Sequence, residues 1–202
     1  MSDLHQLLGN IRKHLPKEKI AYPQVPTFTK IKDKAVLKQQ FIDALALVGG
    51  VCHDVSDITE CQQIMRDKLG GAAVICSATA EWEGNKTIAD VAHPRDLDDV
   101  DLGIIRAEFG VAEMGMVWLT ENSLKINSLG FLSQHLAVLL DPDTITENMH
   151  TAYRQIDFNA SEYGCFVMGP SATADIGATL VRGAQGPRSL TLFFLKTPVP
   201  DQ

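Results

Sequence analysis

The sequence predicts an α/β domain of three layers, in which helices cover both faces of a mainly parallel β-sheet. Short apolar segments of strand length alternate with longer segments whose apolar residues recur at helical spacing. Strands that are apolar throughout are typical of parallel sheets, because helices bury both of their faces. Glycine pairs follow two of the predicted helices, as glycine commonly does after a last helical turn. We expect one domain over residues 34–202, preceded by an N-terminal helix and a Pro-rich arm over residues 1–33.

The first part of the domain predicts a helix followed by a strand–helix–strand unit. A helix is expected over 35–48, a strand over 51–55, a second helix over 57–69 and an apolar strand over 72–76. Strands joined through a helix of this length run parallel, and the crossover between them is right-handed.

The second part of the domain begins with a polar segment over 78–99, which contains Pro94 and predicts a long loop. Further strands are expected over 116–119, 136–140, 165–168 and 190–195, and a helix over 144–156 with Thr144 as its N-cap. The segments 72–76, 136–140 and 165–168 are expected among the buried strands of the parallel sheet.

The first fifteen residues predict a short amphipathic helix, and residues 16–29 with their three prolines predict an irregular connector. The apolar positions at helical spacing are Leu4, Leu7, Leu8, Ile11 and Leu15. This helix packs either on its own domain, which we favour, or on a neighbouring subunit of a homo-oligomer.

Composition and charge exclude several classes of function. The 202 residues are 45% hydrophobic and carry a formal net charge of −7, so phosphate backbones are repelled and nucleic acid is a poor partner. Apolar runs are far shorter than the twenty or so residues of a membrane span, and no secretory signal is apparent, which indicates a cytoplasmic protein. The four cysteines form no C-x-x-C pair, so we expect neither a metal nor another bound cofactor.

The loop that follows the strand predicted over 165–168 is the most informative segment. It reads Gly169-Pro170-Ser171-Ala172-Thr173-Ala174-Asp175-Ile176. Glycine allows close approach of a ligand, the hydroxyls of Ser171 and Thr173 bind polar groups, and free backbone N–H groups attract anions. Asp175 caps a following helix, orients a hydroxyl or acts as a base; Gly186 belongs to a second glycine-rich turn. We expect a small anionic ligand here.

Three segments of the second half resemble the LUD-domain family of the lactate-utilisation protein C type. The run "GCFVMGPSATADIGATLVRGAQGPRSLTLFFL" is similar to its closing signature, Ala112-Glu113-Met114-Gly115-Met116 to an A-E-T-G-T segment, and residues 125–140, with Lys125 and His135, to a basic segment leading into a strand. The chain departs from the pattern at Ala172, Gly177 and Gln185, and at both methionines of the second segment. Each departure removes a polar or charged group from the expected cleft.

The resemblance implies a fold of the NagB/RpiA/CoA-transferase-like type. In that setting Glu113 is a nucleophile or general base, or else a structural carboxylate at a turn. His135 is an acid, base or ligand donor, or a hydrogen-bonded interior histidine. Gly115, Lys125, Gly169 and Gly186 complete the expected ligand-binding set. We expect Glu113, His135 and the Ser171 loop to meet at the carboxyl edge of the sheet.

The resemblance also implies a role in lactate (2-hydroxy acid) oxidation, alongside iron–sulfur partner proteins that carry the electrons. Two other functions stay open: a stand-alone enzyme for a phosphorylated, CoA-linked or folate-like anion, and a ligand-binding module without catalysis.

Overall fold

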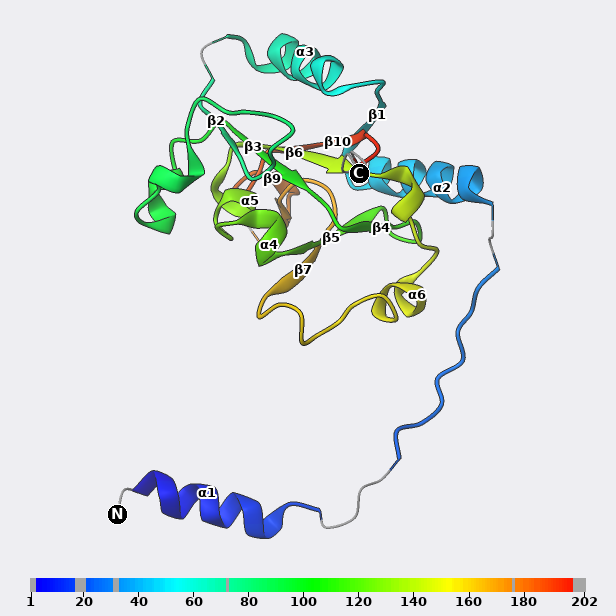
Figure 1. Cartoon of the computed structure of the whole chain (residues 1–202), viewed down its shortest axis with the longest axis vertical. Helices are drawn as coiled ribbons and strands as arrows, with labels where there is room; N and C mark the ends of the chain where they lie inside the picture. Colours follow the sequence, from blue (N-terminus) through cyan, green and yellow to red (C-terminus); the bar gives the residue numbers. More distant parts are fainter. Residues whose placement is uncertain (1–2, 17–20, 31–32, 72, 176, 198–202) are drawn as a thin grey trace, which may run out of the picture.

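The central feature of the fold is a five-stranded parallel sheet with the order β1-β10-β6-β3-β2. The computed structural model describes residues 3–16, 21–30, 33–71, 73–175 and 177–197, so Ala72, where a strand was expected to begin, and Ile176 lie outside it. In sheet order the strands are Val51–Asp54, Ser189–Phe194, His135–Leu140, Leu102–Arg106 and Ile75–Ser77. The expected α/β class with a mainly parallel sheet is confirmed (Figure 1).

Both faces of this sheet are buried, which explains why its strands are apolar throughout. In β6, Leu136, Val138 and Leu140 point into one core cluster, whereas Ala137 and Leu139 point into another. Helix α3 (Ile58–Leu69) covers the second cluster with Cys61 and Met65. The first cluster is covered by α2 (Lys34–Leu47), α4 (Glu121–Leu124) and α5 (Leu129–Leu132). Full burial of each such aliphatic side chain contributes about 1.5–3 kcal/mol.

A second, antiparallel sheet has the order β4-β5-β7, with the bounds Phe109–Val111, Met116–Thr120 and Gly164–Val167. The expectation that residues 165–168 form a buried strand of the parallel sheet is therefore wrong. Among the described strands, β7 pairs with β5 alone. It is half-buried, because it lies at the edge of a small sheet whose outer face is covered by α6 (Met149–Tyr153).

At two places where the sequence predicts the start of a helix, the backbone is extended and pairs with another segment instead. Residues 142–144 form a short 3-10 turn, η3 (Pro142–Thr144), and the next residues run extended to bridge Val111 through Thr146, so Asn148 rather than Thr144 caps the helix that follows. The Ser171 loop leads not into a helix but into a hairpin of β8 (Ala172–Thr173) and β9 (Val181–Arg182). The long loop over 78–99 holds two 3-10 turns, η1 (Ile88–Asp90) and η2 (Pro94–Leu97).

The N-terminal helix α1 (Asp3–His14) forms as expected but lies apart from the sheets in Figure 1. Its leucines are 40–59% exposed, so the favoured packing on its own domain is not seen. The connector instead runs along α6, where Phe28 meets His150 edge-to-face and the Lys30 N–H donates to Glu147. Within the described part of the chain, no helix has the length and apolar character needed to cross a membrane.

Candidate functional site

A cleft of about 540 Å³ opens at the carboxyl edge of the parallel sheet. Its walls come from the segments that follow β2, β3 and β10, and from α4 and the residue after it. Open α/β sheets bind ligands outside the carboxyl ends of their strands, where consecutive loops diverge. The polar side chains that line the cleft are Thr79, Glu81, Arg106, Glu108, Asn122, Ser123, Lys125 and Thr197.

One wall of the cleft is held by the ion pair of Glu81 and Arg106. The guanidinium Nε and Nη2 donate to the two carboxylate oxygens of Glu81 at 2.6 Å each, and Nη1 donates to the Leu195 carbonyl at 3.1 Å. Both side chains are less than a fifth exposed. This bidentate geometry ties the loop after β2 to the ends of β3 and β10. Because three of its N–H groups are engaged in these bonds, Arg106 is held in the wall and shapes the cleft.

The other polar groups remain available to a ligand. Glu108 is an exposed carboxylate just after β3, and it accepts a hydrogen bond from the Thr120 hydroxyl. The backbone of Thr197 is fixed because its N–H donates to Asp141 at 2.9 Å. Partial burial by itself would raise the pKa of Asp141, but the N–H groups of Thr197 and Asp143 donate to the carboxylate and the net effect lowers it. Asp141 therefore stays ionised and holds the backbone at Thr197.

Lys125 supplies the exposed cation of the cleft. It directly follows α4, with φ 59° and ψ −49°, a backbone conformation that side chains other than glycine rarely adopt. Such strain costs about 1–3 kcal/mol and clusters at functional sites. No hydrogen bond or ion pair within the described residues engages its ammonium group. An ammonium group, a carboxylate and several hydroxyls in one cleft can bind a small hydroxylated carboxylate.

His135 lies at the opposite, amino edge, contrary to the expected convergence. It is the first residue of β6, in register with Leu102 and Ser189, the first residues of the neighbouring strands. The Ser171 loop reaches the same edge: the Ser171 N–H donates to the Pro187 carbonyl at 2.9 Å, and the Arg188 N–H donates to Gln134. Gly186 packs against Ser171, where an added Cβ would lie 3.1 Å from that side chain's Cβ.

At the amino edge, His135 belongs to a hydrogen-bonded cluster with Lys68 and Ser189. The Lys68 ammonium donates to the hydroxyls of Ser189 and Thr191 at 3.0 Å each, and Ser189 Oγ lies 2.8 Å from His135 Nδ1. Burial lowers the pKa of His135, and the positive charges of Lys68 and Arg188 lower it further, whereas Asp101 opposes this. Burial likewise lowers the pKa of Lys68. Ser189 Oγ and His135 Nδ1 share one hydrogen bond, and the tautomer of the ring decides which atom donates.

The Glu113 segment lies away from the residues that line the cleft. Glu113 is exposed at the β4–β5 turn, and its carboxylate accepts the N–H of Met149, the first residue of α6, at 3.2 Å. Gly115 has φ +61°, and an added Cβ would lie 2.3 Å from the Leu45 nitrogen of α2. Gly115 therefore allows close packing against α2 and does not line the cleft. Gly169 similarly packs against Val48. Asp175 is exposed beyond β8, with its own N–H near the Thr173 hydroxyl.

Of the residues selected from the sequence, the cleft therefore includes Lys125. Glu81, Arg106 and Glu108 were missed because they carry no motif of their own. Arg106 and Glu108 could have been found from their position, because Arg106 ends the strand Leu102–Arg106 and Glu108 follows it closely. We did not predict this strand, because glycine and acidic residues are mixed with its apolar residues and around it.

The cysteines are poor candidates for metal binding. Cys52, Cys61, Cys76 and Cys165 are free and lie on four different elements. Burial raises the pKa of Cys52 to about 12 and that of Cys61 to about 11, and it also raises the pKa of Cys76 and Cys165. Thiolates, the form that binds metal, are thus disfavoured. The described residues contain no group of three or more His, Cys, Asp or Glu side chains placed to hold a metal ion.

The fold defines an α/β domain with a polar cleft at the carboxyl edge of its sheet, and comparison with known proteins identifies its family. Residues 82–195 match the LUD domain, and the chain belongs to the LUD domain family. It is 28% identical over 221 aligned positions to a lactate utilization protein C of Oceanobacillus iheyensis, covering 95% of this chain and 94% of the relative.

Two more matches are shorter or more distant. A lactate utilization protein C of Halalkalibacterium halodurans is 30% identical over 96 residues, which span 45% of this chain and 42% of the relative. A crystal structure of a DUF162 family protein from Deinococcus radiodurans superposes with a TM-score of 0.62 at 16% identity, covering 81% of this chain and 98% of that one. At this identity the likeness concerns the fold.

Proposed function

We propose that this protein is a component of a lactate (2-hydroxy acid) oxidation system and that its carboxyl-edge cleft binds the acid. The observation that carries the proposal is the match to a lactate utilization protein C over 95% of this chain and 94% of that relative. The cleft supports it chemically, because Lys125 offers a cation for the carboxylate and Glu108 a hydrogen-bond acceptor for the 2-hydroxyl.

Oxidation of a 2-hydroxy acid to a 2-oxo acid removes two electrons and two protons, so an electron acceptor is required. The dispersed, protonated thiols of this chain are unsuited to hold an iron–sulfur cluster. We therefore propose that iron–sulfur partner proteins carry the electrons. Glu108, as an exposed carboxylate of the cleft, is the proposed general base for the hydroxyl proton.

The test is growth of a deletion strain with lactate as the carbon source. Loss of growth on lactate, with normal growth on glucose and rescue by the natural chain, is the expected result. Lys125→Met should rescue poorly, whereas Lys30→Met, which removes an exposed lysine of the N-terminal arm, should rescue fully. Normal growth of the deletion strain on lactate, in the absence of a second family member, contradicts the proposal.

Binding of the acid is measured separately on the purified protein. One hydrogen bond to a charged group contributes about 1.5–3 kcal/mol, so Lys125→Met should weaken binding of lactate by roughly tenfold or more. The natural chain and Lys125→Met are each titrated by calorimetry with lactate and with propionate, the analogue that lacks the hydroxyl. The four affinities separate the contribution of the carboxylate from that of the 2-hydroxyl. Equal affinities of the natural chain and Lys125→Met would place the acid elsewhere.

A further inference from the structure

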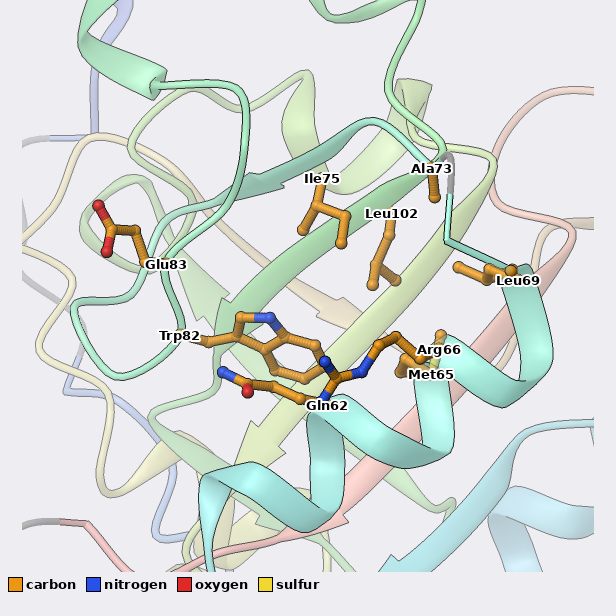
Figure 2. Close-up of a pocket in the computed structure, with 10 residues that line it drawn as sticks. Gln62, Met65, Arg66, Leu69, Ala73, Ile75, Trp82, Glu83 and Leu102 are labelled. Atoms are coloured by element: carbon orange, nitrogen blue, oxygen red, sulfur yellow. The ribbon is translucent and has the colours of Figure 1, made fainter.

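A second cavity, of about 210 Å³, lies between α3, the edge strand β2 and its neighbour β3, on the face of the sheet that α3 covers (Figure 2). Its apolar wall is made by Met65 and Leu69 from α3 and by Ile75 and Leu102 from the strands. Trp82, from the loop after β2, closes the cavity with its indole ring.

The indole of Trp82 is held in place among the core residues of this face of the sheet. The side chain is only 3% exposed, and its N–H donates to none of the described residues. An indole N–H is a hydrogen-bond donor without acceptor capacity. Figure 2 shows the ring lying along the cavity, with its nitrogen on the edge that faces Ile75. A ligand that brings an acceptor into the cavity would satisfy this group.

The mouth of the cavity carries a cation. Arg66 is an exposed residue of α3 that lines the cavity, and Figure 2 shows its guanidinium beside the indole, next to Gln62. Within the described residues, the guanidinium forms no ion pair and donates no hydrogen bond. Glu83 also lies on the rim, but its carboxylate points away from the indole in Figure 2. The polar end of the cavity is thus suited to an anion.

We propose that this cavity is a binding site for a small aromatic carboxylate, whose ring packs on Trp82 and whose carboxylate meets Arg66. An apolar pocket with a few convergent polar groups is the form that small-molecule sites take. Its volume is below that of pockets for drug-sized ligands, which limits the occupant to a single ring with a short side chain. The ring of the ligand meets the accessible edge of the nearly buried indole, and the planar guanidinium binds a carboxylate through two hydrogen bonds.

The site is distinct from the carboxyl-edge cleft but shares a loop with it. Glu81, which precedes Trp82, lines the cleft and pairs with Arg106 there. An occupant that fixes Trp82 therefore also restricts the Glu81 wall of the cleft. The proposal does not depend on which acid the cleft binds.

The test uses 3-phenylpropionate as the probe and 3-phenylpropan-1-ol as its uncharged analogue, titrated by calorimetry and by tryptophan fluorescence. Saturable binding of the acid, at least tenfold tighter than that of the alcohol, is expected. Arg66→Met should weaken the acid at least tenfold and leave the alcohol unchanged. Arg154→Met, at an exposed arginine outside the cavity, should change neither affinity.

Two variants locate the binding within the molecule. Ala73→Met fills the cavity and should abolish binding, while far-ultraviolet circular dichroism verifies that the variant is folded. Trp82→Phe should remove the fluorescence response, because Trp118, the other tryptophan, lies in the antiparallel sheet. Absence of saturable binding, or an affinity unchanged in folded Ala73→Met or in Arg66→Met, overturns the proposal. Lactate-dependent growth is scored independently, so failure of one proposal is distinguishable from failure of the other.

Discussion

The two edges of the parallel sheet differ in what they offer. At the carboxyl edge the strand ends diverge around an open cleft, with a half-buried ion pair in its wall and an exposed lysine on its rim. At the amino edge the family-like loop folds down over the strand starts, and Lys68, Ser189 and His135 bond to one another. A recognisable sequence motif and an accessible site therefore need not coincide, because the residues of a motif can also be needed for packing and hydrogen bonds within the fold.

The largest effect on the free energy of unfolding is expected from removing the Glu81–Arg106 ion pair. This change tests whether the pair makes the carboxyl edge rigid. Removing one partner of a well-buried pair costs about 3–5 kcal/mol; this pair is slightly exposed, so we expect about 2–3 kcal/mol for Glu81→Met or Arg106→Met in urea unfolding. The double variant should lose less than the sum of the single ones, because no lone charge remains.

The control for this prediction is the exposed pair of Lys196 and Asp143, at 3.2 Å with side chains 76% and 65% exposed. Lys196→Ala should change the free energy of unfolding by under about 1 kcal/mol. Strictly additive losses for Glu81→Met and Arg106→Met would show that the two side chains act independently and that the wall of the cleft is not braced by their contact.

A smaller effect, of opposite sign, is expected at Lys125. Glycine adopts the backbone conformation at φ 59° without the steric conflict that a Cβ causes, so Lys125→Gly should stabilise the fold by about 1 kcal/mol. The same variant should bind lactate more weakly, since it lacks the ammonium group. Lys125→Met, which keeps the Cβ, should lose binding without gaining stability. A stability unchanged in Lys125→Gly would mean that this turn carries no strain.

Much of the fold followed from the sequence, and the failures share a physical cause. The apolar run Leu136–Leu140 was correctly predicted as a buried strand, because a strand whose two faces are both buried is apolar throughout. Strand pairing is a long-range property, so the run at Cys165 gave a strand without revealing that its partner is β5 in a separate antiparallel sheet. The helix predicted from Thr144 begins later in the structure, because Thr146 forms a β-bridge with Val111.

The candidate site was less predictable for a related reason. Lys125 was found through family resemblance, whereas Glu81 and Arg106 come together from distant loops through an ion pair that no local pattern encodes. His135 was selected as a polar group at the mouth of a strand. It is the first residue of β6, and the beginning of a parallel strand lies at the amino edge of the sheet, opposite the edge where we expected it.

The smallest effect concerns pH and tests whether the amino edge is a closed, neutral cluster. The pKa of His135 is lowered by burial and by the charges of Lys68 and Arg188, so the folded protein resists protonation at this ring. Below the ordinary histidine pKa of about 6.5 the unfolded chain binds a proton that the folded chain does not. The contribution of His135 is therefore present above that pH and is lost as the pH falls through the lowered folded-state value.

We expect the free energy of unfolding of the natural chain to decline between about pH 7 and pH 5, and to decline less steeply in His135→Gln. Lys68→Met should also flatten the profile, because it removes one of the charges that disfavour protonation. His5→Gln, at an exposed histidine of α1, is the control and should leave the slope unchanged. If His135→Gln follows the natural chain across this range, the ring is protonated freely in the folded state. The amino edge would then be open to solvent and ligands, and the contrast between the two edges would no longer hold.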